Sequence, residues 1–224
     1  MHWFATRLVS LLTRVGEHTV ESLQQAYALL SFIGEVCITL LRQSVRPGRW
    51  RWRPLLFNLQ RAGFEALPIT GLTAALLGVV VAYQGADQLR HYGANIIVVE
   101  LVGYAMLREF APLITAIIIA GRSGSAYAAQ IGTMLVTEEI DAMRTIGIDP
   151  LEMLVLPKMF AMLLALPLLT VFADLCGVLG GMLMASTQLG VGYREFLQRF
   201  ATEVPLSALM LGLGKSLVFA LVIT

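Results

Sequence analysis

Residues 99–150 read VELVGYAMLREFAPLITAIIIAGRSGSAYAAQIGTMLVTEEIDAMRTIGIDP, and this stretch decides how the chain is interpreted. It places Arg108 and Glu109 inside an apolar run from Ile96 to Ala120, which is long enough to cross a bilayer, since a span needs about 20 residues. A charge at the centre of a membrane helix costs roughly 2.5–3.5 kcal/mol, so such charges face a bundle interior, a cavity or each other. Adjacent helical positions point about 100° apart, which predicts that these two charged groups look in different directions. An interhelical salt bridge and the polar rim of a substrate cavity both remain open.

A ladder of small residues follows the charged pair. Its two rows, each with four-residue spacing, consist of Ala120, Gly124, Ala128 and Gly132, and of Gly121, Ser125 and Ala129. Small residues at this spacing let helix backbones approach closely inside a membrane. The ladder therefore predicts tight helix packing and indicates no chemistry.

The stretch closes with a short acidic helix between two turn signals. The residues assigned to this helix and its ends are Thr137, Glu138, Glu139, Asp141, Met143, Arg144 and Gly147. Thr137 is the candidate N-cap, and Gly147 is expected to end the helix as its left-handed C′ residue. Asp149 is expected to cap the next element. A short helix with an acidic face and an apolar edge suits docking to a partner protein, and a plain surface helix is the alternative.

The motifs LREFAP, AGRSGSAYAAQIG and TEEIDAMRTIGIDP resemble the signature of the MlaE/YrbE-type permeases. These are the membrane subunits of the Mla and Mce ABC systems, which move phospholipids or other lipids between membranes. The resemblance runs from about Pro54 to the end of the chain. It implies an all-α integral membrane fold and a dimeric permease in the bacterial inner membrane, with no cofactor.

The resemblance also implies partners and a lipid site. The short helix would be the coupling helix that sits on a separate cytoplasmic ATPase, and the outer face would receive an MCE-domain periplasmic protein. The implied pocket lies at the interface with a second copy of the chain. Its implied lining residues are Val81, Leu89, Tyr92, Arg108 and Glu109. Such a set offers apolar walls for lipid tails and charged groups for the headgroup.

Composition supports a membrane protein, because 57% of the residues are hydrophobic and only 14% are charged. A net charge of +1 leaves no basic excess that would indicate nucleic acid binding. Cys37 and Cys176 stand singly, and His2, His18 and His91 are scattered, so no metal site is predicted. The sequence contains no GxxxxGK[ST] loop, which predicts a transport subunit that is not itself an enzyme and depends on the ATPase of a partner.

We divide the chain into a cytoplasmic or interfacial helical region, residues 1–62, and a permease transmembrane domain, residues 63–224. Residues 20–41 are apolar but carry several polar groups, which favours a helix lying at the membrane interface. Six arginines and two tryptophans are interleaved in residues 42–61. The positive-inside rule places this segment in the cytoplasm.

About four transmembrane helices are predicted. They cover residues 66–83, 96–120, 153–186 and 205–224, and the third is expected to be one long, kinked helix. Residues 192–205 are expected to form a short helix on the outer face. Full-length family members have five such helices, so we interpret the chain as a fragment that lacks the C-terminal hairpin.

Asp174 lies inside the third predicted span. A structural hydrogen bond to a neighbouring helix and a role with substrate or protons are both open for this buried acid. For the chain as a whole, an ion-coupled secondary transporter or a membrane scaffold is the alternative function. A secondary transporter would be expected to show inverted repeats, and we find no internal repeat.

Overall fold

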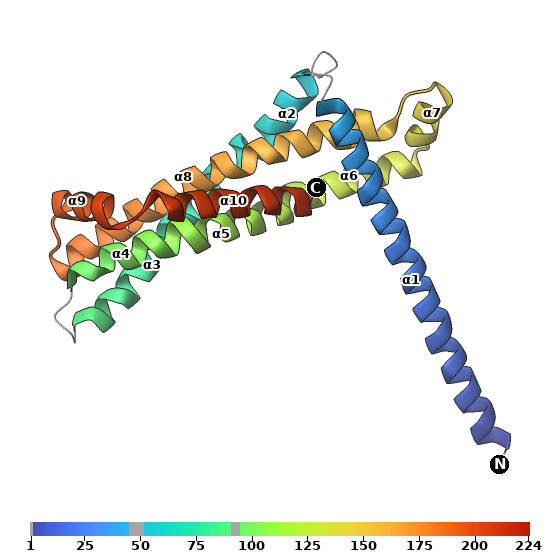
Figure 1. Cartoon of the computed structure of the whole chain (residues 1–224), viewed down its shortest axis with the longest axis horizontal. Helices are drawn as coiled ribbons and strands as arrows, with labels where there is room; N and C mark the ends of the chain where they lie inside the picture. Colours follow the sequence, from blue (N-terminus) through green and yellow to red (C-terminus); the bar gives the residue numbers. More distant parts are fainter. Residues whose placement is uncertain (1, 45–51, 91–94) are drawn as a thin grey trace. The chain divides into compact units, whose positions relative to one another are not determined.

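The computed structural model describes residues 2–44, 52–90 and 95–224, and every regular element within these ranges is a helix (Figure 1). The chain divides into two units, Met1–Trp50 and Arg51–Thr224, which are described separately. The second unit includes residues 51–62, which the sequence alone groups with the N-terminal region. The prediction of an all-α fold is confirmed.

The described part of the first unit is one helix, α1 (His2–Ser44), with 43 residues. Large apolar side chains such as Leu23, Tyr27 and Leu30 are exposed along it. Because polar residues alternate with these side chains, α1 has the pattern of a helix that lies on an apolar surface. Its location at the membrane interface stays a prediction.

In the second unit, four helical stretches are long and apolar enough to cross a membrane, as predicted. They are Arg53–Leu89, Val98–Val136, Leu151–Leu189 and Leu206–Ile223. The first consists of α2 (Trp52–Ala62), a short 3-10 turn and α3 (Leu67–Arg90). The last is α10 (Leu206–Ile223). The chain is therefore a multi-pass membrane protein.

The second stretch is longer than predicted, because the helix continues beyond Ala120 through the small-residue ladder. It contains α4 (Val98–Tyr104), α5 (Ala111–Ile119) and α6 (Ser125–Val136). π-helical turns at Ala105–Phe110 and Ala120–Gly124 join these three helices. Such turns are rare in proteins, and many of those that occur lie at functional sites. Here one contains Arg108 and Glu109, and the other contains Arg122.

The core of the unit is built around α8 (Leu156–Leu189), which is a single helix with Pro167 inside it, as predicted. α8 packs against α3 at the level of the backbone. A Cβ atom added to Gly78 would collide with the backbone of Gly177, and one added to Gly180 would collide with the backbone of Ala75. Glycine thus permits a helix contact that no larger residue would allow.

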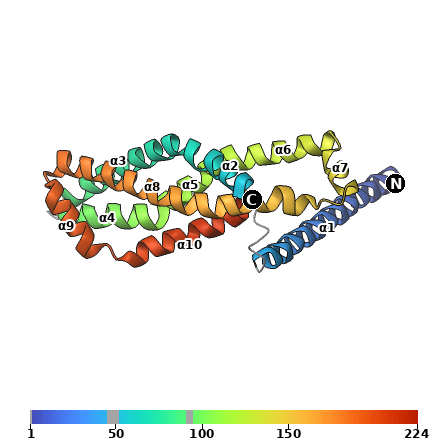
Figure 2. The ribbon, with the colours of Figure 1, turned by 90° about the horizontal axis from the view of Figure 1, so that it is seen from above.

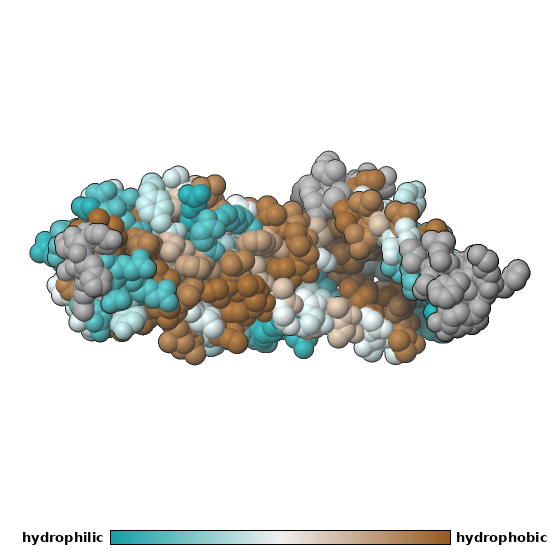
Figure 3. Space-filling view, turned by 90° about the horizontal axis from the view of Figure 1, so that it is seen from below, coloured by the Kyte–Doolittle hydropathy of each residue, from teal (hydrophilic) through white to brown (hydrophobic). Residues whose placement is uncertain are grey.

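Two short helices lie at opposite ends of the second unit (Figures 1 and 2). α9 (Tyr193–Glu203) packs on the core through the buried side chain of Phe196, and α7 (Glu139–Thr145) lies at the other end. Arg199 on α9 donates a 2.7 Å hydrogen bond to Glu100 on α4. This bond raises the pKa of Arg199. In Figure 3, hydrophobic side chains dominate the middle of the face shown, and hydrophilic ones gather at the end that carries α9.

Candidate functional site

Arg108 and Glu109 meet a third charge, Lys215, which the sequence analysis did not assign to a site. Arg108 Nε lies 3.3 Å from Glu109 Oε1, and Lys215 Nζ donates a 2.6 Å hydrogen bond to Glu109 Oε2. Lys215 Nζ also donates to the carbonyl oxygen of Arg108 at 3.1 Å. The carboxylate is thus held between two cations. A lysine in the middle of the apolar helix α10 is the sequence signal that could have identified this residue.

The prediction that the Arg108 and Glu109 groups look in different directions is wrong. Neighbouring side chains still leave a π-helical turn at different angles, but the Arg108 and Glu109 side chains are long enough to bend toward each other. Their length and flexibility allow an ion pair between adjacent residues.

The three charged groups are not enclosed by the helices of this chain. The exposed fractions of the Arg108, Glu109 and Lys215 side chains are 52%, 54% and 38%. Charges inside a membrane span need water, a lipid headgroup or protein around them. An interhelical salt bridge and the polar rim of a cavity are therefore compatible interpretations. Glu109 bridges α10 and the π-helical turn, and about half of its side-chain surface stays exposed.

Val81 and Leu89, the other predicted lining residues that can be located, lie on α3. Both are partly buried and pack against the apolar core that contains Val102 and Met106. Their role in a lipid pocket stays a prediction. Tyr92 lies outside the described residues.

The short helix α7 begins differently from the prediction. Glu138, not Thr137, precedes its first residue, and Glu138 adopts the left-handed conformation with φ 58°. The Thr137 hydroxyl donates to the carbonyl oxygen of Thr133, one turn back in α6, at 3.0 Å. The prediction that Thr137 caps α7 is therefore wrong. The Thr137 hydroxyl bonds to α6 because the backbone changes direction only at the next residue, Glu138.

The predicted end of α7 is confirmed. Gly147 has φ 77°, its N–H donates to the carbonyl oxygen of Arg144, and the N–H of Ile148 donates to that of Met143. These two bonds form a Schellman motif. Asp149 Oδ1 accepts a 2.9 Å hydrogen bond from the N–H of Leu151, as expected for a cap. The Schellman motif and the Asp149 cap thus fix the corner between α7 and the π-helical turn Leu151–Val155, which leads into α8.

The surface around α7 is acidic and apolar at the same time. Glu138, Glu139 and Asp141 are exposed, and Arg144 lies 3.5 Å from Asp141. Beside them, Val136 is 84% exposed. The apolar Leu135 and Ile146 are also exposed, and Met143 is partly buried. Nothing in the described part of the chain covers this surface.

The small-residue ladder makes little contact within this chain. Gly121 and Gly132 have open space where a Cβ atom would lie, and Ala120, Ser125 and Ala128 are exposed. Only at Gly124 would a Cβ atom meet a neighbouring described helix, 3.3 Å from Cγ2 of Ile223 on α10. The ladder leaves a smooth exposed strip on α6, and its role in tight packing stays a prediction.

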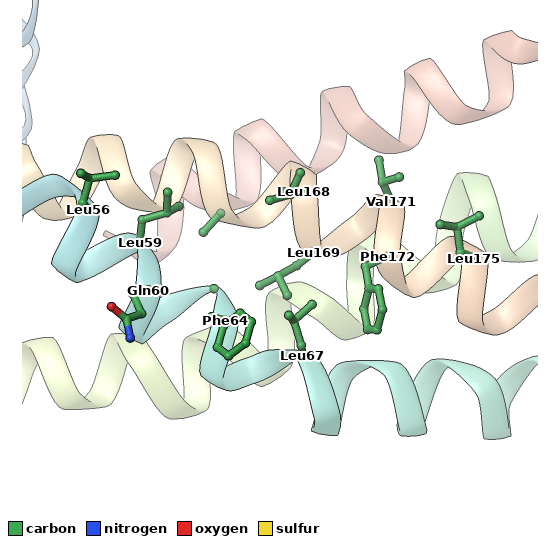
Figure 4. Close-up of a pocket in the computed structure, with 12 residues that line it drawn as sticks. Leu56, Leu59, Gln60, Phe64, Leu67, Leu168, Leu169, Val171, Phe172 and Leu175 are labelled. Atoms are coloured by element: carbon green, nitrogen blue, oxygen red, sulfur yellow. The ribbon is translucent and has the colours of Figure 1, made fainter. Parts of the chain in front are cut away.

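An apolar groove of about 770 Å³ lies between α2, α3 and α8 (Figure 4). Leucines and phenylalanines from both sides point into it, including Leu59, Phe64, Leu169 and Phe172. It is a separate cavity from the Arg108–Glu109–Lys215 cluster, since none of these three residues lines it. Its wall suits hydrocarbon and offers only Gln60 as a polar side chain.

Asp174 on α8 is buried, and neither of its side-chain oxygens has a hydrogen-bond partner among the described residues. A structural hydrogen bond from Asp174 to a neighbouring helix is therefore not found among the described residues, and its role stays a prediction.

Residues 55–224 match the family described as Permease MlaE. The chain belongs to this permease family. It is 35% identical over 200 residues to a protein of Synechocystis named as a probable ABC transporter permease, covering 89% of this chain and 74% of that protein. It is 31% identical over 222 residues to a protein of Rickettsia typhi with the same description, covering 97% and 82%. The MlaE protein of Haemophilus influenzae, named as an intermembrane phospholipid transport system permease, is 32% identical over 173 residues, covering 76% and 66%.

The MlaE match covers all of the second unit except its first four residues. The three motifs that carry the resemblance lie within it, on the stretch from the charged cluster to the corner after α7. In this MlaE-type chain, the charged cluster and the α7 surface are two places where polar groups gather and stay exposed among the described residues. We treat them as the candidate substrate site and the candidate docking site.

Proposed function

We propose that this chain is the permease subunit of an ABC transporter that moves phospholipid or a related lipid between membranes, as a homodimer driven by a separate ATPase. Membership of the MlaE family and the phospholipid transport named for the Haemophilus relative support this proposal. The observation that carries it in the structure is the half-exposed Arg108–Glu109–Lys215 cluster inside the membrane-spanning bundle.

The charge of this cluster matches the headgroup of a phospholipid. Two cations and one carboxylate leave one positive charge, and a phosphodiester carries one negative charge. Glu109 holds both cations in place, and their remaining N–H groups stay available for a phosphate oxygen. A second copy facing this surface would complete the pocket, with Val81, Leu89 and Tyr92 as further lining residues.

The proposed coupling runs through α7. The ATPase would contact the exposed carboxylates of Glu138, Glu139 and Asp141 and the apolar side chains beside them. Closure of two ATPases on binding ATP would move both copies of α7. The Gly147 corner and the Asp149 cap join α7 rigidly to α8, so the movement would reach the transmembrane bundle and squeeze the pocket between the two copies.

The arrangement in the cell follows from the same proposal. The arginine-rich segment 42–61 supports an orientation in which the α7 end of the bundle would lie on the cytoplasmic side of the bacterial inner membrane. The α9 end would then face the periplasm, where an MCE-domain protein would receive or deliver lipid.

Purification from native membranes tests this function. We expect an ABC ATPase, an MCE-domain protein and phospholipid to copurify in stoichiometric amounts, as measured by mass spectrometry. Reconstitution in nanodiscs with that ATPase is expected to give ATP-dependent lipid transfer. Recovery of a stable complex without an ATPase would contradict the proposal, and transfer driven by an ion gradient would favour a secondary transporter.

A further inference from the structure

A second cavity, which is polar and has a volume of about 630 Å³, lies between α2, α6 and the start of α8. The polar residues that line it include Asn58, Arg61, Arg122, Tyr127, Gln130 and Lys158. Arg122 is 14 residues from Arg108 along one helical stretch, which corresponds to about 20 Å. The cavity is therefore a different site from the charged cluster, and the inference drawn from it does not rest on the proposed function.

Lys158 is the unusual member of this cavity. Only 6% of the residue is exposed, and Nζ has no hydrogen-bond partner among the described residues. Lys158 Nζ lies over the face of the Tyr127 ring, 4.9 Å from the ring centroid. The Tyr127 hydroxyl is also buried without a hydrogen-bond partner. Two buried donors beside each other, both unsatisfied, are costly unless a ligand supplies the acceptor.

The other charges of the cavity do not supply that acceptor. Glu65 is the acidic residue of the lining, and its Oε2 is bound to Arg122 at 2.5 Å. Arg122 also donates to the carbonyl oxygen of Arg61 at 3.3 Å. Arg61 and Lys158 consequently have no carboxylate partner in the described part of the chain. The cavity lining carries three cationic side chains and one carboxylate, so its net charge is positive.

We propose that this cavity binds a phosphate group, with the Lys158 amine and the Tyr127 hydroxyl as buried donors and Arg61 as the exposed cation. Phosphate offers several strong acceptor oxygens at once, and both lysine and arginine bind it well. The volume exceeds that of a single ion, and the lining includes the apolar Leu154 and Phe57, which is 61% exposed. The phosphate is carried either by a membrane lipid or by a soluble phosphate compound.

Photocross-linking tests the lipid source. A photoreactive benzoylphenylalanine replaces Phe57 in the full chain, which is reconstituted in phosphatidylcholine nanodiscs with either phosphatidic acid or diacylglycerol added. We expect mass spectrometry to find phosphatidic acid attached at position 57, with a yield at least fivefold above that of diacylglycerol. Lys158→Met and Tyr127→Phe should each lower the yield at least threefold, and Lys158→Arg should retain most of it.

Isothermal titration of the same proteins with inorganic phosphate tests the soluble source. Phosphate binding that Lys158→Met abolishes, without lipid labelling, assigns the site to a soluble phosphate compound. Equal labelling by diacylglycerol and phosphatidic acid, together with no phosphate binding, would overturn the proposal. Tyr127→Phe removes only a hydroxyl without a hydrogen-bond partner among the described residues, so we expect the variant to keep the wild-type melting temperature. It tests the same proposal if Lys158→Met fails to fold. Arg194→Met is the control, because it removes an exposed cation on α9 that lines neither the cavity nor the charged cluster, and it should leave both readouts unchanged.

Discussion

Lys215 Nζ lies 2.6 Å from Glu109 Oε2, although 106 residues separate the two along the chain. The contact joins α10 to the π-helical turn that contains Arg108 and Glu109. It places a second cation on a carboxylate that already has one, inside the apolar part of the bundle.

Lys215→Met is expected to weaken lipid binding more than it weakens the fold. The methionine keeps most of the length and apolar character of the stem, and Arg108 still neutralises Glu109. We expect a loss of at least fivefold in copurified phospholipid, with a melting temperature within a few degrees of wild type. Lys215→Arg, which restores the charge, should recover most of the lipid. A full loss of folded protein from the membrane would instead assign Lys215 a structural role.

Glu109→Ala distinguishes a structural ion pair from a lipid cavity. A buried pair that loses one partner is destabilised by about 3–5 kcal/mol, whereas half-exposed groups can be solvated by water or headgroups. Because Arg108 and Glu109 are both about half exposed, we expect near-normal expression and ATPase assembly for Glu109→Ala, with reduced lipid cross-linking. Arg108→Ala should behave in the same way. A large loss of melting temperature with unchanged cross-linking per folded molecule would show that the pair is structural.

Reversing Glu138 and Glu139 to lysine is expected to uncouple transport from ATP without unfolding the permease. Both carboxylates are exposed, so the change alters the docking surface and leaves the core intact. Pull-down of the ATPase and its turnover in nanodiscs should both fall at least fivefold. Glu138→Gly is the control for backbone strain, because glycine fits φ 58° better than glutamate and removes only one charge. Unchanged binding in the double reversal would exclude this surface as the docking site.

The ladder can be tested with two leucine substitutions that differ in their surroundings. Gly121 has open space in this chain, so Gly121→Leu should leave the single chain folded and reduce dimer formation at least tenfold if a second copy packs there. Gly124→Leu should also disturb the contact with Ile223 and lower the melting temperature. Stoichiometry and thermal stability of the purified complex are the measurements. Normal dimers of Gly121→Leu would show that this strip faces lipid.

Sequence by itself determined the features that depend on local pattern. The four apolar stretches are visible because a membrane span is a run of neighbouring residues, and four helical stretches of the described residues are long and apolar enough to cross a membrane. The end of α7 was predicted because a glycine after a helix favours φ above zero, and Gly147 has this conformation. The start of α7 was not predicted correctly, because the Thr137 hydroxyl could either accept from an N–H of α7 as a cap or donate to a carbonyl oxygen of α6. The left-handed residue Glu138 follows it, and the hydroxyl donates to Thr133 in α6.

Only the tertiary structure decided which polar groups meet across the bundle. No local pattern relates Lys215 to Glu109, because the contact depends on how α10 packs against a turn more than 100 residues earlier. The same holds for Lys158 and Asp174, whose side chains are buried by helices from distant parts of the chain and lack hydrogen-bond partners among the described residues. Hydrophobicity along the chain fixes which segments enter the membrane, whereas helix packing fixes what each charge finds there.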